Sequence, residues 1–277
     1  MITPGVERPV ISAGEKKMKV TWYGTATIGI DDGNTKLLFD PFVRMNLRMR
    51  KTTTQVDGFT GFDAIFVTHG HFDHIYSIPE IMRLDEKVPV YCTETPKKTL
   101  VGRGAPADRI HVIRPMDEIT AGEFTVRVWK FRHIVFDPWY ILSVMPKCVV
   151  EFPVLFWQAY INKKMPDKGE IVAYEILWRD KRIFLTGSFR DTPEIDYPHD
   201  MDLLVLANGG CTYVPERTAD FIAKYKPKAI LVDHFDNAFP PATREMDLTR
   251  LKNTVARNHP DIRFIIPEAG KTLDLLD

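Results

Sequence analysis

Cysteine is scarce in this chain, which has only three in 277 residues, Cys92, Cys148 and Cys211. An odd number of widely spaced cysteines without a CxxC pair argues against a disulfide framework and fits a reducing compartment. Long apolar runs are also lacking, since the longest reach about ten residues and a bilayer span needs roughly 20. Residues 1–17 contain no apolar segment typical of a signal peptide. We therefore expect a cytoplasmic protein without a transmembrane segment.

The chain has no excess of either charge, because 37 lysines and arginines balance 37 aspartates and glutamates. A protein with a net charge of zero does not attract nucleic acid or an anionic membrane through its overall charge. It can still carry a local basic patch. We expect no nucleic-acid partner, since a basic arm is also absent. There is no repeat, low-complexity tract or linker either. This predicts one domain over 1–277, with a flexible lead-in at 1–17.

Short apolar or β-branched runs recur along the chain and predict strands. They cover residues 18–24, 26–31, 35–41, 64–68, 88–93, 109–113, 124–131, 171–179, 181–187, 202–208, 229–234 and 263–267. Helical patterns lie between them, at residues 75–84, 214–226 and 242–257. Strands mixed with helices, with hairpins near both ends, predict an α/β protein of two mixed β-sheets flanked by helices, an αββα sandwich.

The strongest motif is Thr68-His69-Gly70-His71-Phe72-Asp73-His74, which directly follows the apolar run AIFV. If the strand ends at Thr68, the histidines lie on the loop at its carboxyl end. Four potential ligands within six residues can converge on one or two metal ions without help from distant parts of the chain. Imidazoles and a carboxylate suit zinc, manganese or iron. The sequence therefore predicts a metal site.

This HxHxDH pattern at a strand end resembles the signature of the metallo-β-lactamase superfamily. Further segments resemble its ascorbate-6-phosphate lactonase-like branch, although Thr25 stands where that branch usually has a histidine; they are residues 19–26, 38–42, 201–210 and 230–234. The resemblance implies the αββα fold. It also implies a hydrolase in which a metal-bound hydroxide attacks an ester, lactone or phosphoester bond of a small molecule.

The resemblance also implies the ligands. A third histidine is expected on a loop after a strand, where His133 stands, and another at a strand end, where His234 stands. One zinc would then be held by His69, His71 and His133, and a second, weaker one by Asp73, His74 and His234, with manganese as an alternative metal. Asp73 would also orient the attacking hydroxide, which makes it the expected catalytic residue.

The chain departs from the family at Leu185-Thr186-Gly187-Ser188, where an aspartate usually bridges two metals. The hydroxyl of Ser188 is a poor metal bridge at neutral pH. Zinc-dependent β-lactamases of the third subclass share this serine and still bind two zincs, so both one and two ions stay open. The superfamily's mono-iron dioxygenases take their carboxylate from this aspartate, so iron chemistry is disfavoured.

Two features near the motif have alternative interpretations. Asp40 matches a family aspartate, and we expect it to accept a hydrogen bond from a ligand histidine and to fix its tautomer. The alternative is an aspartate that caps a turn before Pro41. Arg44 and Arg48 belong to a basic run, which is either a solvated loop or an anion site for a phosphorylated or carboxylated substrate.

Residues 134–170 form an aromatic insertion, and its segment 134–160 resembles no part of the family. Four prolines disfavour one long regular element, and a solvent-exposed patch of seven aromatics would be too large for a monomer. We therefore expect the insertion to pack on the body, on a second chain or on a membrane surface. Because it begins right after His133, we predict a lid or pocket wall that contacts substrate through Trp139, Tyr140 and Trp157. A dimer contact is the alternative, which leaves a homo-oligomer open.

Two other functions compete with the small-molecule hydrolase. The apolar insertion leaves open a phosphodiesterase acting on phospholipid-like or nucleotide substrates. The serine at position 188 leaves open a metal-binding scaffold that has lost its activity.

Overall fold

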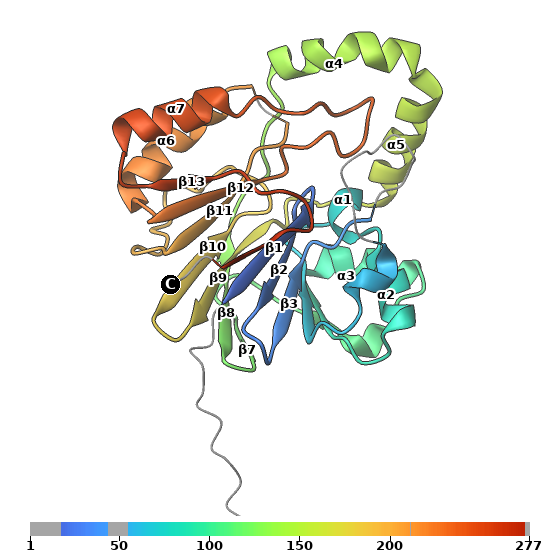
Figure 1. Ribbon diagram of the computed structural model, residues 1–277. Helices are drawn as coiled ribbons and strands as arrows, with labels where there is room; N and C mark the ends of the chain where they lie inside the picture. The colour runs from blue at the N-terminus through green and yellow to red at the C-terminus, as the bar shows by residue number, and fades with distance from the viewer. Residues whose placement is uncertain (1–17, 44–54, 211, 275–277) are drawn as a thin grey trace, which may run out of the picture.

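Two mixed β-sheets pack face to face with helices on their outer sides in the computed structural model (Figure 1), which describes residues 18–43, 55–210 and 212–274. The predicted αββα sandwich is confirmed. The lead-in predicted at 1–17 and the residues Arg44 and Arg48 lie outside the described residues.

The first sheet has seven strands in the order β14-β1-β2-β3-β4-β5-β6. Its strands are β1 (Lys19–Gly24), β2 (Thr27–Asp31), β3 (Lys36–Phe39), β4 (Ala64–Phe66), β5 (Val90–Cys92), β6 (Ile110–Val112) and β14 (Thr272–Asp274). Strand pairs from β14 to β3 are antiparallel, whereas β3 to β6 run parallel. The helical segments on this half are η1 (Val56–Phe59), α1 (Phe72–Ile75), α2 (Ile78–Leu84), α3 (Glu94–Gly102) and η2 (Ala107–Arg109).

The second sheet repeats this plan in the order β13-β12-β11-β10-β9-β8-β7. Its strands are β7 (Glu118–Ala121), β8 (Phe124–Lys130), β9 (Val172–Trp178), β10 (Lys181–Leu185), β11 (Leu203–Ala207), β12 (Ala229–Asp233) and β13 (Arg263–Ile265). Strands β10 to β13 run parallel. Every residue of β11 and β12 is buried, because helices α6 (Val214–Tyr225) and α7 (Thr249–Asn258) cover one face and the first sheet covers the other.

The structure corrects several predicted boundaries. Strand β4 ends at Phe66, because the backbone N–H and the hydroxyl of Thr68 both donate to the Asp40 carboxylate instead of continuing the sheet. Only α2 forms within the helix predicted at 75–84, and it starts with a proline in its first turn. The short α1 precedes it and ends at Ile75. The helix predicted at 242–257 begins only at Thr249, since the hydroxyl of Thr243 accepts from Phe239 N and fixes a loop there. Strands β7 and β14 and helix α3 were not predicted.

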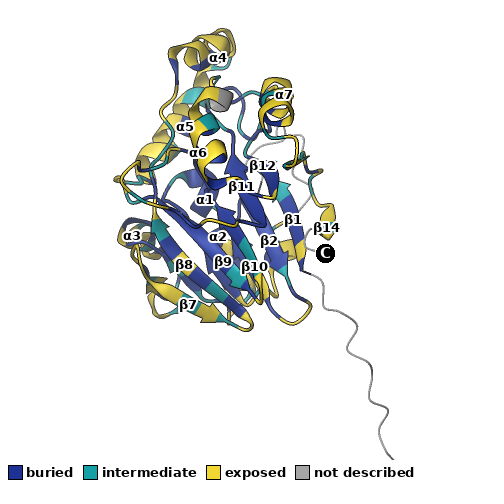
Figure 2. Cartoon of the chain, turned by 90° about the vertical axis from the view of Figure 1, so that its left-hand side faces the viewer, coloured by how far each residue is buried: buried dark blue, intermediate teal, exposed yellow. Residues whose placement is uncertain are grey.

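The insertion folds into two helices, α4 (Pro138–Val150) and α5 (Phe152–Lys164). Each begins with a proline in its first turn, where a missing N–H costs nothing. The chain turns by 119° between them, so the prediction against one long element is confirmed. Figure 2 shows that much of both helices is exposed. Among the described residues, no single helix is long and apolar enough to cross a bilayer, and the α4–α5 pair has the composition but is bent.

Candidate metal centre

The six predicted ligands meet where the parallel strands of both sheets end. His69 and His71 lie on the loop after β4, and Asp73 and His74 occupy the first turn of α1. His133 follows β8, and His234 directly follows β12. Open α/β sheets generally place ligands at the carboxyl ends of their strands. Residues from separate parts of the chain are thereby brought to one place.

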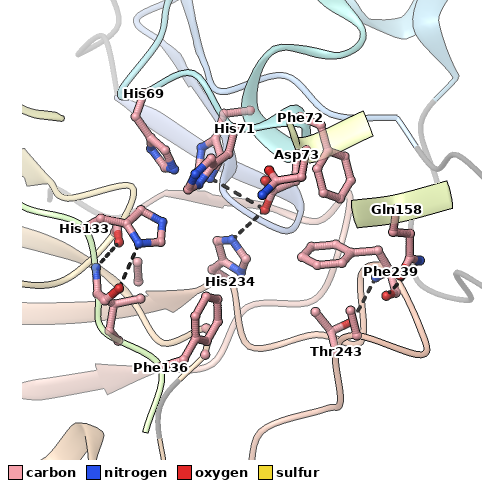
Figure 3. Close-up of a pocket in the computed structure, with 18 of the residues that line it drawn as sticks. His69, His71, Phe72, Asp73, His133, Phe136, Gln158, His234, Phe239 and Thr243 are labelled. Atoms are coloured by element: carbon pink, nitrogen blue, oxygen red, sulfur yellow. Dashed lines mark hydrogen bonds and ion pairs between the residues drawn. The ribbon is translucent and has the colours of Figure 1, made fainter. Parts of the chain in front are cut away.

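These side chains form two groups of three (Figure 3). One potential ligand atom from each of His69, His71 and His133 lies within 4.8 Å of the others, and the same holds for Asp73, His74 and His234. Three imidazoles make a donor set suited to zinc with an open fourth position, and the second group adds a carboxylate. The donor chemistry and the convergence both fit divalent metal ions. We call the two groups the histidine triad and the Asp73 triad.

The histidine triad is held in its neutral form. Burial lowers the pKa of His69 well below its usual value and also lowers the pKa of His71. Burial, helped by the neighbouring His71, lowers the pKa of His133 to about 4. The His133 Nδ1–H donates to the Ile134 carbonyl at 2.8 Å, which leaves Nε2 for a ligand. All three imidazoles can therefore bind a metal at neutral pH without first losing a proton.

One buried atom of this triad has no partner within the described residues. Nε2 of His69 is inaccessible to water and accepts or donates no hydrogen bond there. On the other side of the ring, Nδ1 lies 3.0 Å from the Thr68 hydroxyl. Buried polar atoms in native proteins almost always have a partner. A metal ion bound between the three rings would provide one.

The Asp73 triad contains opposite charges. Burial opposes ionisation of Asp73, but His74 and His234 outweigh it and lower the pKa of the carboxyl group. Burial likewise opposes the charged form of His234, but its contact with Asp73 raises the pKa to about 9. Oδ2 of Asp73 lies 3.1 Å from His234 Nε2 and 3.7 Å from His74 Nε2. Below about pH 9 a metal ion entering this triad must therefore displace a proton from His234.

Asp40 is fully buried and supports residues of both triads. Its Oδ2 is 2.9 Å from Nδ1 of His74 and accepts the Thr68 hydroxyl at 2.5 Å, while Oδ1 accepts the Thr68 N–H at 2.8 Å. The contact with His74 fixes which ring nitrogen of that histidine faces the site. Asp40 thus orients His74 directly and His69 through Thr68.

Ser188 lies in the same pocket as the triads, beside Gly187. Its hydroxyl accepts a hydrogen bond from Ile134 N at 3.0 Å, so it ties the loop after His133 to the end of β10. It brings no charge to the site, unlike the aspartate that the family usually has there. A second carboxylate does approach the triads from elsewhere: Oδ2 of Asp167 is 3.3 Å from Nε2 of His71, a contact that no sequence pattern suggested.

The triads open into a cavity of about 290 Å³. Its walls are mainly apolar, and beyond the triads and Ser188 its polar side chains include Gln158, Asn162, Asp236, Thr243 and Arg244 (Figure 3 labels Gln158 and Thr243). Arg244 is the only lysine or arginine among the described lining residues. No sequence pattern pointed to it, because it stood inside a predicted helix. Its guanidinium carbon lies 5.5 Å from the ring centre of Tyr140.

The insertion does form part of the pocket wall, but only one of its three predicted contacts lines the cavity. Tyr140 is buried and faces the pocket. Trp139 and Trp157 are 60% and 41% exposed and are not among the lining residues. These two tryptophans therefore lie outside the cavity lining, and their contact with substrate stays a prediction. On a helix, neighbouring residues point about 100° apart, so only one of the pair at 139 and 140 can face inward.

Gly70 separates two ligands of the histidine triad and lies against the insertion. A Cβ atom at this position would be 2.4 Å from the carbonyl oxygen of Pro166. We expect Gly70→Ala to push the loop aside and weaken zinc binding by roughly 10- to 100-fold, the usual effect of disturbing the support of a ligand. Equilibrium dialysis against zinc measures this. Gly102→Ala is the matched control, since a Cβ there meets nothing within 4 Å; equal zinc affinity of both variants would contradict the geometry.

Comparisons with known proteins agree with this architecture. A family profile described as the Beta-lactamase superfamily domain matches residues 35–235. The chain is 24% identical over 269 residues to a UPF0173 metal-dependent hydrolase of Methanopyrus kandleri, and the match covers 93% of this chain and 100% of that relative.

Solved structures are similar over nearly the whole chain. Igni18, a metallo hydrolase from Ignicoccus hospitalis, has a TM-score of 0.66 and 17% identity, covering 93% of this chain and 97% of that one. The metallo-β-lactamase fold protein YhfI from Bacillus subtilis has a TM-score of 0.64 and 15% identity, covering 94% and 99%. At these identities the structures establish the fold, and the profile match over more than half of the chain establishes the family. The chain belongs to the metallo-β-lactamase superfamily.

Proposed function

We propose that this protein is a metal-dependent hydrolase that cleaves an ester, lactone or phosphoester bond of a small molecule. The observation that carries the proposal is the convergence of the two triads at the base of one cavity. A divalent ion at such ligands would lower the pKa of a coordinated water to about 7 and polarise an oxygen of the substrate. We expect zinc, with manganese as the alternative, in one or two copies.

The residues of this chain have distinct parts in that reaction. The histidine triad offers three neutral nitrogens, and the Asp73 triad offers a carboxylate and two imidazoles. The Asp73 carboxylate stays ionised at neutral pH, so it can accept a proton from the attacking water and hold that water in position. Asp40 and Thr68 keep His74 and His69 in the orientation that ligation needs.

The lining of the cavity indicates what kind of substrate fits. Its mainly apolar wall favours a molecule with an apolar portion, and the guanidinium of Arg244 favours a carboxylate or phosphate on that molecule. The resemblance to the lactonase-like branch suggests a lactone. The apolar wall instead favours a phospholipid-like phosphodiester, which we keep as the second candidate.

A hydrolysis screen tests the proposal. Metal-stripped, zinc-loaded and manganese-loaded protein should be assayed on acyl esters, lactones and phosphodiesters, each with and without an anionic group. We expect hydrolysis of one bond class by a loaded form only, with a lower Michaelis constant for the anionic member. Bound metal without hydrolysis of any substrate in the panel would instead support the inactive metal-binding scaffold.

The serine at position 188 predicts how the second ion should respond to an added charge. Ser188→Asp places a carboxylate in the pocket that both triads share, and Coulomb attraction should tighten the more weakly held ion. We expect at least roughly tenfold higher affinity for the second zinc, which corresponds to about 1.4 kcal/mol, measured by calorimetric titration. Ser188→Asn is the control, because an asparagine side chain has nearly the same size as an aspartate side chain but carries no charge. If the aspartate variant binds less zinc than wild type, residue 188 does not act on the site.

A further inference from the structure

The α4–α5 hairpin has an apolar outer face that nothing in the described structure covers. Twelve of the seventeen large hydrophobic side chains that are exposed in the described residues lie between positions 135 and 160. Monomeric proteins seldom concentrate so much exposed apolar surface in one place. We define the hairpin face by its six most exposed members, each at least 60% exposed: Trp139, Leu142, Val149, Val150, Phe152 and Phe156.

The hairpin is already anchored by its inner side, so the hairpin face is not available to fold onto the body. Tyr140, Val144 and Cys148, spaced four residues apart, form a narrow buried stripe on α4. On α5 the buried amide of Gln158 donates to the carbonyl groups of Phe239 and Pro240 at 3.2 and 2.9 Å. Rotating the helices to hide the outer face would break these contacts. Within the described part of the chain nothing else can cover the apolar face, which is therefore open to a surface outside the protein.

Charged residues are rare within the hairpin, and lysines follow its end. Between Pro138 and Asn162 the only charged residues are Lys147 and Glu151, and exposed Lys163, Lys164 and Lys168 follow the end of the apolar stretch. The ammonium of Lys164 lies 5.5 Å from the ring centre of Tyr160 on the same helix. Tryptophan, tyrosine and lysine are the side chains that gather where a protein meets the membrane–water interface. The lysines would meet anionic headgroups although the net charge of the protein is zero.

The shape of the hairpin favours lipid over a second protein. Val149, Val150 and Phe152 lie at the 119° turn between the helices, where they flank the half-buried Glu151. The turn forms a corner projecting away from both sheets (Figure 1). A second copy of the chain would need a surface that is complementary to itself, and a projecting corner is not. Acyl chains are fluid and can surround a convex corner without any preformed cavity.

The inner side of the same hairpin faces the candidate active site. Tyr140, Leu155, Gln158 and Asn162 line the cavity that holds the two triads. The two helices therefore separate that cavity from the surface on which the hairpin face lies. A molecule with an acyl portion and an anionic group could move from a bilayer along these helices toward the metal ligands and Arg244.

We propose that the α4–α5 hairpin docks this protein peripherally on bilayers that contain anionic lipid, and that the cavity beneath it receives an amphiphilic substrate from them. The docking stands on the hairpin face alone, whereas the substrate class rests on the proposed hydrolase function. Neither helix spans the bilayer in this arrangement, because the turn brings the chain back to the body. The apolar corner inserts among the acyl chains and the lysines remain at the headgroups.

Vesicle sedimentation of the full-length protein tests the docking without any need for turnover. We expect wild type to bind phosphatidylcholine vesicles containing phosphatidylglycerol more tightly than pure phosphatidylcholine. Val150→Glu with Phe152→Ser should weaken binding to both by roughly tenfold or more, since two apolar anchors are lost. Lys163→Glu with Lys164→Glu should weaken binding to the anionic vesicles only. The matched control is Met116→Glu, at a site that is 84% exposed but far from the hairpin in sequence, and it should bind like wild type.

Three results would overturn the docking. The first is that wild-type protein is absent from every vesicle pellet, and the second is that the Val150→Glu, Phe152→Ser variant binds vesicles as tightly as wild type. The third is that wild type binds no vesicles but forms a dimer in sedimentation velocity, whereas this variant is a monomer. The last result would make the hairpin face an interface between two copies. Hydrolysis of a water-soluble short-chain substrate separates the two proposals. If the protein binds vesicles but no metal-loaded form hydrolyses any substrate, only the proposed hydrolase function is rejected. If a loaded form hydrolyses the soluble substrate but the protein binds no vesicles, only the membrane docking is rejected.

Discussion

Asp73→Asn should lower the catalytic constant of the zinc-loaded protein by roughly 10²- to 10⁴-fold, the range usually lost with a general base. Asp73 is the only carboxylate of the two triads, and its lowered pKa keeps it ionised at neutral pH. The asparagine side chain keeps the shape but neither the charge nor the basicity. Steady-state kinetics on the substrate found by the hydrolysis screen measures the loss, and zinc content shows how much of it comes from a weaker second ion.

Asp167→Asn is the comparison for this variant. Its carboxylate also lies near a ligand, 3.3 Å from His71 Nε2, but it belongs to neither triad. We expect a loss of less than about tenfold, because only a neighbour of the ligand changes. If the two asparagine variants lose the same activity, the special part given to Asp73 is wrong.

His71→Ala should also have a large effect, because it removes a ligand of the histidine triad. Two imidazoles are a poor zinc site, and without the ion the attacking water has its ordinary pKa. We expect a loss of at least roughly 10³-fold in kcat/KM together with loss of the zinc held by that triad. Metal analysis and kinetics should be made on the same preparation.

His199→Ala is the matched control for that experiment. The exposed side chain of His199 contacts Asp196 and Tyr225, and the Arg182 guanidinium donates to its backbone carbonyl, which the alanine keeps. Removal of the side chain should therefore change neither zinc content nor rate. A His71→Ala protein that keeps full activity would show that the histidine triad is not the site of reaction.

The ligands from His69 to His74 were predictable because they lie close together in the sequence. The HxHxDH motif follows an apolar strand, and a loop at a strand end can gather its own ligands without knowledge of the rest of the fold. His133 and His234 are distant in the chain, and they were predicted through family resemblance and not through spacing. Their place beside the loop depends on the positions of β8 and β12 within the second sheet.

The substrate-facing residues could not be predicted in the same way. Trp139 and Tyr140 are neighbours of similar character, and only packing of the stripe at positions 140, 144 and 148 decides which one faces the cavity. Arg244 was hidden inside a predicted helix, and it lines the cavity because hydrogen bonds of Thr243 and Met246 hold that segment as a loop. Such long-range contacts leave no periodic signal in the sequence.

The most direct test of the central claim is a zinc titration of stripped protein with the substrate identified by the screen. Bound zinc and hydrolysis rate are measured at every point, at neutral pH. We predict that stripped protein is inactive, that the rate rises with bound zinc and levels off at no more than two equivalents, and that His71→Ala protein stays inactive throughout. Stripped protein that hydrolyses the substrate as fast as loaded protein, or wild type that takes up no zinc, would contradict the account.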